Sequence, residues 1–175
     1  HRRSGLASMI PSELWPHFSK GNTITLLETG AEFFPALASA IDHARKEVFL
    51  ETYIFRHDRI GEMIADALVR AAERGVVVSL LVDGFGSRDF VASHMNILLD
   101  KGVRMLVYRR EVGRLLLRRH RLRRLHRKLA SIDGRVAFVG GINIIDDHNT
   151  AAPEHPRHDY AIRIEGPLLQ PIHDS

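Results

Sequence analysis

The sequence predicts an α/β domain in which a mostly parallel mixed sheet is flanked by helices. Three observations lead to this fold class. Short apolar runs of strand length alternate with amphipathic segments of helical spacing. Two of the predicted helices are followed by a glycine, Gly75 and Gly102, a residue favoured at helix ends. A length of 175 residues, with 45% hydrophobic and 26% charged residues, fits one globular domain and excludes a disordered chain.

The first part of the chain alternates strand and helix. Residues 23–27 (TITLL) predict a short strand, and residues 31–45 a helix with apolar side chains at helical spacing. Residues 47–55 (EVFLETYIF) are rich in β-forming residues and predict a buried strand. Residues 60–74 predict a second helix, since their apolar side chains fall on one stripe.

The alternation continues through the middle of the chain. Residues 76–82 (VVVSLLV) predict a strand, residues 83–87 a loop, residues 89–101 a helix and residues 103–108 another strand. Strands joined through helices indicate parallel pairing. In such sheets the functional loops follow the carboxyl ends of the strands.

The last part of the chain predicts a hairpin and a final strand. Residues 128–132 and 135–139 flank Asp133-Gly134, a strong turn signal. Residues 148–158 are polar and contain proline, which predicts a loop, and residues 159–165 predict the final strand.

Charge is distributed unevenly. The formal net charge is +4, but residues 109–128, the basic segment, contain ten Lys and Arg residues and one acid, Glu111. The rest of the chain is therefore acidic. Three interpretations stay open for the basic segment: a solvated surface, phosphate contacts with nucleic acid, or an anionic membrane surface into which its leucines insert. The side chains concerned are Arg114, Arg118, Arg119, Arg121, Arg123 and Arg124.

Composition excludes several classes of protein. The chain has no cysteine, which excludes disulfides, thiol catalysis and thiolate metal sites. No uncharged run exceeds ten residues, so none reaches the roughly 20 apolar residues of a membrane-spanning helix.

One cluster of residues indicates a candidate catalytic site. The pattern is HxK, four residues, D, six residues, GGxN, formed by His126, Lys128, Asp133, Gly140, Gly141 and Asn143. In a strand His126 and Lys128 share a face, which places an imidazole beside an ammonium. Imidazole can attack phosphorus while the cation neutralises phosphate oxygens. The glycines allow close backbone approach to a ligand, and the Asn143 amide can donate to a phosphate oxygen.

At these residues the sequence resembles the phospholipase D superfamily, whose signature is this HKD motif. Other segments resemble its bacterial cardiolipin synthase branch, in the type without an amino-terminal membrane anchor, and the resemblance spans residues 24–167. The segments are LLETGAEFFPALASAI, VFLETYIF, RGVVVSLLVDGFGS, RRLHRKLASIDGRVAFVGGIN and HDYAIRIEGP.

The resemblance implies a phospholipase D-like lobe and a mechanism. Members carry two HKD motifs that face each other across one active site. His126 would attack phosphorus and form a phosphohistidine, while the second histidine protonates the leaving alcohol. Lys128 and Asn143 would bind phosphate oxygens, with Gly140 and Gly141 beside them. Asp159 would orient the nucleophilic ring. The chemistry needs no metal and no cofactor.

Two acidic residues can be functional or purely structural, and three histidines raise the question of a metal site. Asp133 either supports the active site or only forms the Asp133-Gly134 turn. Glu51 lies in a buried-looking strand, where it either supports the site or forms a structural ion pair. His148, His155 and His158 fit no established metal-ligand spacing, so we expect no metal among them.

The chain contains only one HxK motif, which leaves two arrangements. We expect residues 1–22 to form an extension, residues 23–167 the first HKD domain with residues 109–125 as a basic insertion, and residues 168–175 the start of a further element. The second motif then lies in a longer chain; alternatively, two copies of this chain pair.

The resemblance implies a phosphatidyltransferase that uses phosphatidylglycerol to make cardiolipin, peripheral on the cytoplasmic side of a bacterial inner membrane. Two alternatives stay open. The first is a homodimeric phosphodiesterase or nuclease, although the shortage of aromatic residues near the arginines argues against nucleic acid. The second is a membrane-binding half-domain without catalysis.

Overall fold

The computed structural model describes residues 21–108 and 127–166 as seven strands and three helices. Every strand and helix expected from the sequence is present, with ends shifted by a few residues. In chain order they are β1 (Thr23–Glu28), α1 (Thr29–Asp42), β2 (Glu47–Thr52), α2 (Arg59–Glu73), β3 (Val77–Asp83), α3 (Arg88–Asp100), β4 (Arg104–Tyr108), β5 (Leu129–Ile132), β6 (Val136–Gly140) and β7 (Tyr160–Glu165).

The strands form one mixed sheet in the order β1-β7-β6-β5-β2-β3-β4. The α/β class and the mixed sheet are confirmed, but this sheet is mostly antiparallel rather than mostly parallel. Only β2 with β3 and β3 with β4 pair in parallel, because helices connect them. The hairpin β5–β6 and the strand β7 add antiparallel pairs, which join this half of the sheet to β1 and β2.

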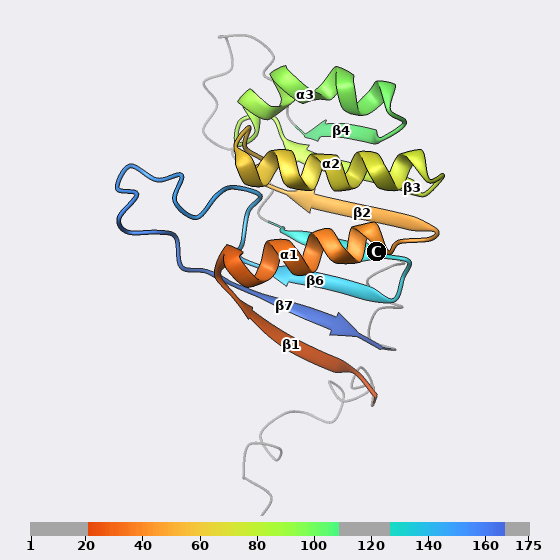
Figure 1. The fold of residues 1–175 in the computed structure, drawn as a ribbon, viewed down its shortest axis with the longest axis horizontal. Coiled ribbons are helices and arrows are strands. Elements are labelled where there is room, and N and C mark those ends of the chain that lie inside the picture. Colours follow the sequence, from red (N-terminus) through yellow and green to blue (C-terminus); the bar gives the residue numbers. More distant parts are fainter. Residues whose placement is uncertain (1–20, 109–126, 167–175) are drawn as a thin grey trace, which may run out of the picture.

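The three helices lie on one face of the sheet, in front of the strands in Figure 1. Each helix buries its apolar stripe against that face, and α1 and α2 pack side by side. The largest fully buried side chains include Phe34, Leu37, Ile41, Ile64, Leu68, Leu80 and Phe138.

Strand β2 ends three residues earlier than the sequence predicts. The backbone N–H of Ile54 donates to Asn143 Oδ1 (3.0 Å), and that of Phe55 donates to Ser87 Oγ (2.8 Å). These side chains replace the ladder partners that a longer strand would need. Residues 53–58 therefore form a loop, the β2–α2 loop.

One edge of the sheet collects most of the predicted site. Strands β1, β2, β3, β4 and β6 run in the same direction, and β5 and β7 run in the opposite direction. The carboxyl ends of β1, β2, β3, β4 and β6 thus lie at the same side of the sheet as the amino-terminal ends of β5 and β7. We call this the site edge.

Candidate functional site

Lys128 lies at the site edge, directly before β5. Its backbone carbonyl accepts a hydrogen bond from Gly140 N–H (3.3 Å), which joins the start of β5 to the end of β6. The half-buried side chain contributes to a small cavity together with Thr52 and Gly140. Lys128 is therefore positioned by two neighbouring strands. His126 and the six arginines singled out from the sequence (Arg114, Arg118, Arg119, Arg121, Arg123 and Arg124) lie outside the described residues.

Asn143 follows β6 and is anchored to the β2–α2 loop. Its side-chain oxygen accepts the hydrogen bond from Ile54 N–H, and Ile144 N–H donates to the Ile54 carbonyl (3.0 Å). Because the oxygen is used in this way, the amide Nδ2 is the end of the side chain that can donate to a ligand. The structure thus fixes the orientation of the Asn143 amide.

Asp159 directly precedes β7 and lies against Gly141. Its Oδ1 accepts from the N–H of Tyr160 (2.8 Å), and its backbone carbonyl accepts from Thr29 (2.9 Å). A Cβ atom at position 141 would overlap the Asp159 carboxylate. Asp159 is therefore brought to the same edge as Lys128 and Asn143.

The two glycines pack against β7 and against Asp159, the residue that precedes it. A Cβ atom at position 140 would overlap the backbone of Tyr160 and Ala161. Gly140 donates its N–H to Lys128, and Gly141 donates to the Tyr160 carbonyl (2.8 Å). Both N–H groups therefore have partners within the sheet.

These contacts predict different effects for the two alanine variants. Gly140→Ala should lower the free energy of unfolding by about 2–3 kcal/mol, because backbone atoms of β7 must move. Gly141→Ala should cost less stability, since only the Asp159 side chain must turn away. Urea unfolding of both variants measures the difference. Equal losses, or a larger loss for Gly141→Ala, would contradict this assignment.

The structure does not bring Asp133 to the other candidates. Asp133 lies in the β5–β6 turn at the opposite edge of the sheet, where it and Gly134 have φ angles of 55° and 61°. Its carboxylate accepts from three successive backbone N–H groups, those of Arg45, Lys46 and Glu47, at 2.7–3.3 Å.

Asp133 is also stabilised as the anion. Burial alone would raise the pKa of Asp133, but these backbone hydrogen bonds and the charge of Lys46 outweigh burial, and the pKa is lowered. The position and the bonds both fit the structural interpretation of this residue.

Glu51 is a buried acid in β2, 6% exposed. Burial raises its pKa, and the positive charge of Arg127 opposes this effect. Its register partner in β5 is Leu129, the residue after Lys128. The charge of Arg127 thus acts on Glu51 beside the start of β5, and both interpretations of Glu51 stay open.

The buried carboxylate predicts a pH-dependent effect of Glu51→Gln. A raised folded-state pKa contributes stability below the unfolded pKa, and this contribution is lost as pH rises through the folded pKa. We therefore expect Glu51→Gln to raise the thermal unfolding midpoint at pH 7. The two midpoints should converge below pH 4.5, the ordinary pKa of the group. A variant that is less stable at pH 7 would show that the pair with Arg127 dominates.

Sequence reasoning missed the residues that hold the loops at the site edge. Asp58 caps α2 by accepting from Ile60 N–H (3.1 Å) and Gly61 N–H (2.9 Å), and it also accepts from Asp146 N–H and the Asn149 amide. Burial alone would raise its pKa, but these hydrogen bonds lower it. An Asp before an apolar periodic segment is a known cap signal, which could have identified this residue.

The three loop histidines follow β6 but do not gather around one point. His158 contacts Glu28 and the Tyr160 hydroxyl, both at 3.0 Å, while His148 contacts the Pro153 carbonyl at 3.1 Å.

Within the described ranges, no helix has the length and apolar content needed to cross a membrane.

Comparisons with known proteins agree on one family. Residues 37–166 match the family described as "Cardiolipin synthase, PLD-like domain". The chain is 41% identical over 153 residues to cardiolipin synthase B of Salmonella typhimurium, covering 87% of this chain and 37% of that protein. It is 33% identical to cardiolipin synthase A of Pseudomonas putida, covering 88% of this chain and 32% of that protein. The chain thus spans about a third of the length of these relatives.

A solved structure shares the fold. The phospholipase D family member Nuc of Salmonella typhimurium superposes with a TM-score of 0.65 at 21% identity, over 88% of this chain and 91% of that chain. Similarity at this identity concerns the fold alone, and it extends over nearly the whole length of both chains.

Proposed function

Because this chain belongs to the phospholipase D-like domain family of cardiolipin synthases, we propose that it is one catalytic lobe of a phosphatidyltransferase. In this proposal a phosphatidyl group passes from one phosphatidylglycerol to the hydroxyl of another, which yields cardiolipin and glycerol. The observation that carries the proposal is the 41% identity to cardiolipin synthase B across 87% of the chain.

The proposed chemistry has two displacements at phosphorus. In the first, the His126 imidazole forms a P–N bond while the P–O bond to the leaving glycerol breaks, and the glycerol oxygen takes a proton from a histidine of a second lobe. In the second, the acceptor hydroxyl gives its proton to that same histidine and attacks phosphorus, which breaks the P–N bond. No oxidant, metal or cofactor enters the balance of this reaction.

The described residues support this assignment of roles. Lys128 would neutralise the phosphate oxygens from the start of β5. Asn143 would donate through Nδ2, since its oxygen is held by Ile54. Asp159 would accept the other ring N–H of His126, which fixes the tautomer and stabilises the cation that forms. All three lie at the site edge, which is the place where functional groups gather in open α/β sheets.

We propose that the basic segment holds this lobe on anionic lipid. Arginine suits bidentate contact with phosphate, and each basic residue near an anionic membrane contributes roughly 1 kcal/mol. The location would then be peripheral, on the cytoplasmic face of a bacterial inner membrane. The second histidine would come from a second lobe in a longer chain, or from another copy of this chain.

Lipid product analysis tests the function. The full-length gene product is incubated with phosphatidylglycerol vesicles, and the lipids are separated by thin-layer chromatography. Formation of cardiolipin together with free glycerol is the expected result. Release of phosphatidic acid without cardiolipin, or no lipid turnover at all, would overturn the proposal.

A homodimeric phosphodiesterase is the second candidate. It is kept because the chain contains only one HxK motif, so that a second copy of the chain could supply the second histidine. Plasmid DNA cleavage and light scattering of the 175-residue chain test it. DNA cleavage by a dimer, without lipid turnover, would favour this candidate, whereas an inactive monomer is the result we expect.

A further inference from the structure

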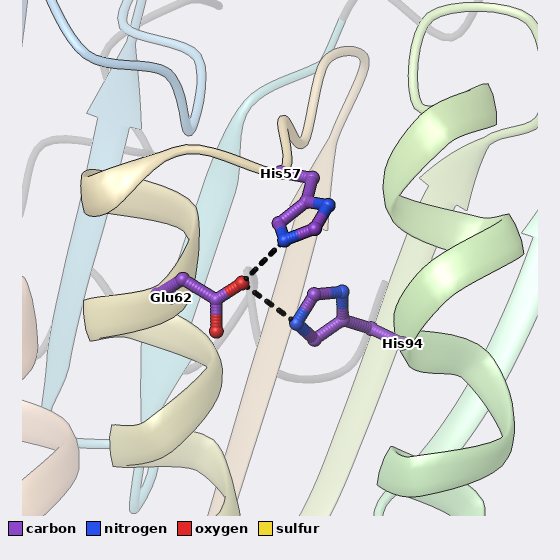
Figure 2. Close-up of side chains that lie close together, drawn as sticks. All are labelled: His57, Glu62 and His94. Atoms are coloured by element: carbon purple, nitrogen blue, oxygen red, sulfur yellow. Dashed lines mark ion pairs between the residues drawn. The ribbon is translucent and has the colours of Figure 1, made fainter.

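Two histidines and one glutamate from three different parts of the fold meet between α2 and α3 (Figure 2). His57 comes from the β2–α2 loop, Glu62 from the first turn of α2, and His94 from the middle of α3. One oxygen, Glu62 Oε1, lies 2.9 Å from His57 Nε2 and 2.9 Å from His94 Nε2. Figure 2 shows both rings pointing their Nε2 atoms at this oxygen.

His94 is held in one orientation by its own helix. Its ring stacks on Phe90 with a centroid distance of 4.7 Å and an interplanar angle of 7°. Its Nδ1 lies 2.7 Å from Ser93 Oγ, and that hydroxyl donates to the Asp89 carbonyl at 2.8 Å. Because Nδ1 is paired with the Ser93 hydroxyl, Nε2 is the ring nitrogen that faces Glu62 and the one available to a metal ion.

We propose that His57, Glu62 and His94 bind one divalent transition-metal ion, with Zn²⁺ as the best match. The three ligand atoms lie within 4.8 Å of one another. Small side-chain rotations would place each ligand atom 2.0–2.2 Å from a shared ion, the distance at which Zn²⁺ binds imidazole nitrogen and carboxylate oxygen. Two histidines and a glutamate are an established zinc ligand set, and a neighbour that fixes the second ring nitrogen is typical of histidines that bind metal.

Accessibility permits the ion to enter. The side chain of His94 is only 12% exposed, whereas those of His57 and Glu62 are 52% and 44% exposed. An ion would therefore rest on a buried imidazole at its base and keep an open position toward solvent for a water molecule. This proposal departs from the expectation that the chain binds no metal, an expectation that was argued from the spacing of His148, His155 and His158.

The ion would connect the β2–α2 loop, α2 and α3, of which the loop already contacts α3 through the stacked rings of Phe55 and Phe90 and the Arg56–Asp89 ion pair. Within the described residues α2 and α3 touch only sparsely, and His57 belongs to the same loop as Ile54, the residue that orients Asn143. Metal binding should therefore stabilise this loop and its attachment to α3. The proposal concerns a site separate from the phosphate-binding residues, and it does not depend on the proposed lipid substrate.

Calorimetric titration of the full chain with zinc chloride tests the proposal, using protein without a purification tag and treated beforehand with a chelator. We expect one equivalent to bind and the thermal unfolding midpoint to rise with zinc concentration. Glu62→Gln and His94→Gln should each weaken binding by at least about 10-fold. The matched control is His155→Gln, an exposed loop histidine, which should leave binding unchanged.

A second measurement separates metal binding from folding. Unfolding midpoints in excess chelator should be similar for wild type and Glu62→Gln, because that side chain is half-exposed. Co²⁺ should give a visible absorption spectrum in the wild type that Glu62→Gln loses. The proposal is overturned if wild type binds no zinc, or if zinc affinity and the Co²⁺ spectrum are the same in Glu62→Gln and His94→Gln as in wild type.

Discussion

Replacing His126 by alanine in the full-length gene product should reduce cardiolipin formation by at least about 10³-fold. The reason is chemical. In the proposed mechanism His126 supplies the nucleophile, and without a P–N bond the phosphatidyl group has no covalent carrier between donor and acceptor. The measurement is thin-layer chromatography of the lipids formed from phosphatidylglycerol vesicles. The labelled phosphatidyl group trapped on wild-type protein should also be missing in the variant.

His120 offers a matched control, because it is the other histidine of the basic segment. His120→Ala removes the same side chain from the same charged surroundings and should leave the rate within about twofold. If His120→Ala were as damaging as His126→Ala, the effect would come from the basic segment as a whole. If His126→Ala kept a tenth of the activity, His126 would not be the nucleophile.

Asp133→Ala should lower the free energy of unfolding by about 2–4 kcal/mol, the largest loss of stability that we predict. The carboxylate satisfies three backbone N–H groups in the connection between α1 and β2, and alanine leaves them to solvent. Alanine also fits poorly at a φ angle of 55°. Activity of the folded variant should remain, since Asp133 lies at the edge away from Lys128. Urea unfolding measures the loss.

The conservative variant and pH separate these contributions. Asp133→Asn keeps one acceptor oxygen and tolerates positive φ, so its loss should be smaller than that of alanine. The pKa of Asp133 is lowered by folding, so its stabilisation is complete above the ordinary value of 3.8 and disappears as pH falls through the lower folded value. The difference between wild type and Asp133→Ala should therefore shrink below about pH 4. A difference that stays constant with pH would exclude the charge as its origin.

Local pattern was sufficient for most of the fold. Helical spacing identified α1, α2 and α3, and Asp133-Gly134 identified the hairpin whose turn has two positive φ angles. The hairpin also explains the position of Asp133. Strand β5 lies between Lys128 and Asp133, so the two residues are at opposite ends of that strand. Pairing direction was harder, since a sequence pattern does not say which strands become neighbours after a hairpin.

Parts of the site depend on contacts that sequence spacing does not reveal. The orientation of Asn143 comes from Ile54, which belongs to a loop far earlier in the chain. Gly141 is small because Asp159 lies beside it, and that contact exists only once β6 and β7 pair. His57, Glu62 and His94 show no ligand spacing along the chain, because α2 and α3 bring them together only through tertiary packing.

The pairing of β1 with β7 has a consequence for biosynthesis. Strand β1 is synthesised first among the described strands, but it pairs with β7, which is synthesised last. Strand β2 likewise gains its second neighbour only when β5 has been synthesised. Helices α1 and α2 can form early, but the sheet beneath them cannot close until the segment after the basic residues has been made. Contacts this distant in sequence slow folding, so nascent chains of this lobe should expose β1 and β2 for most of their synthesis.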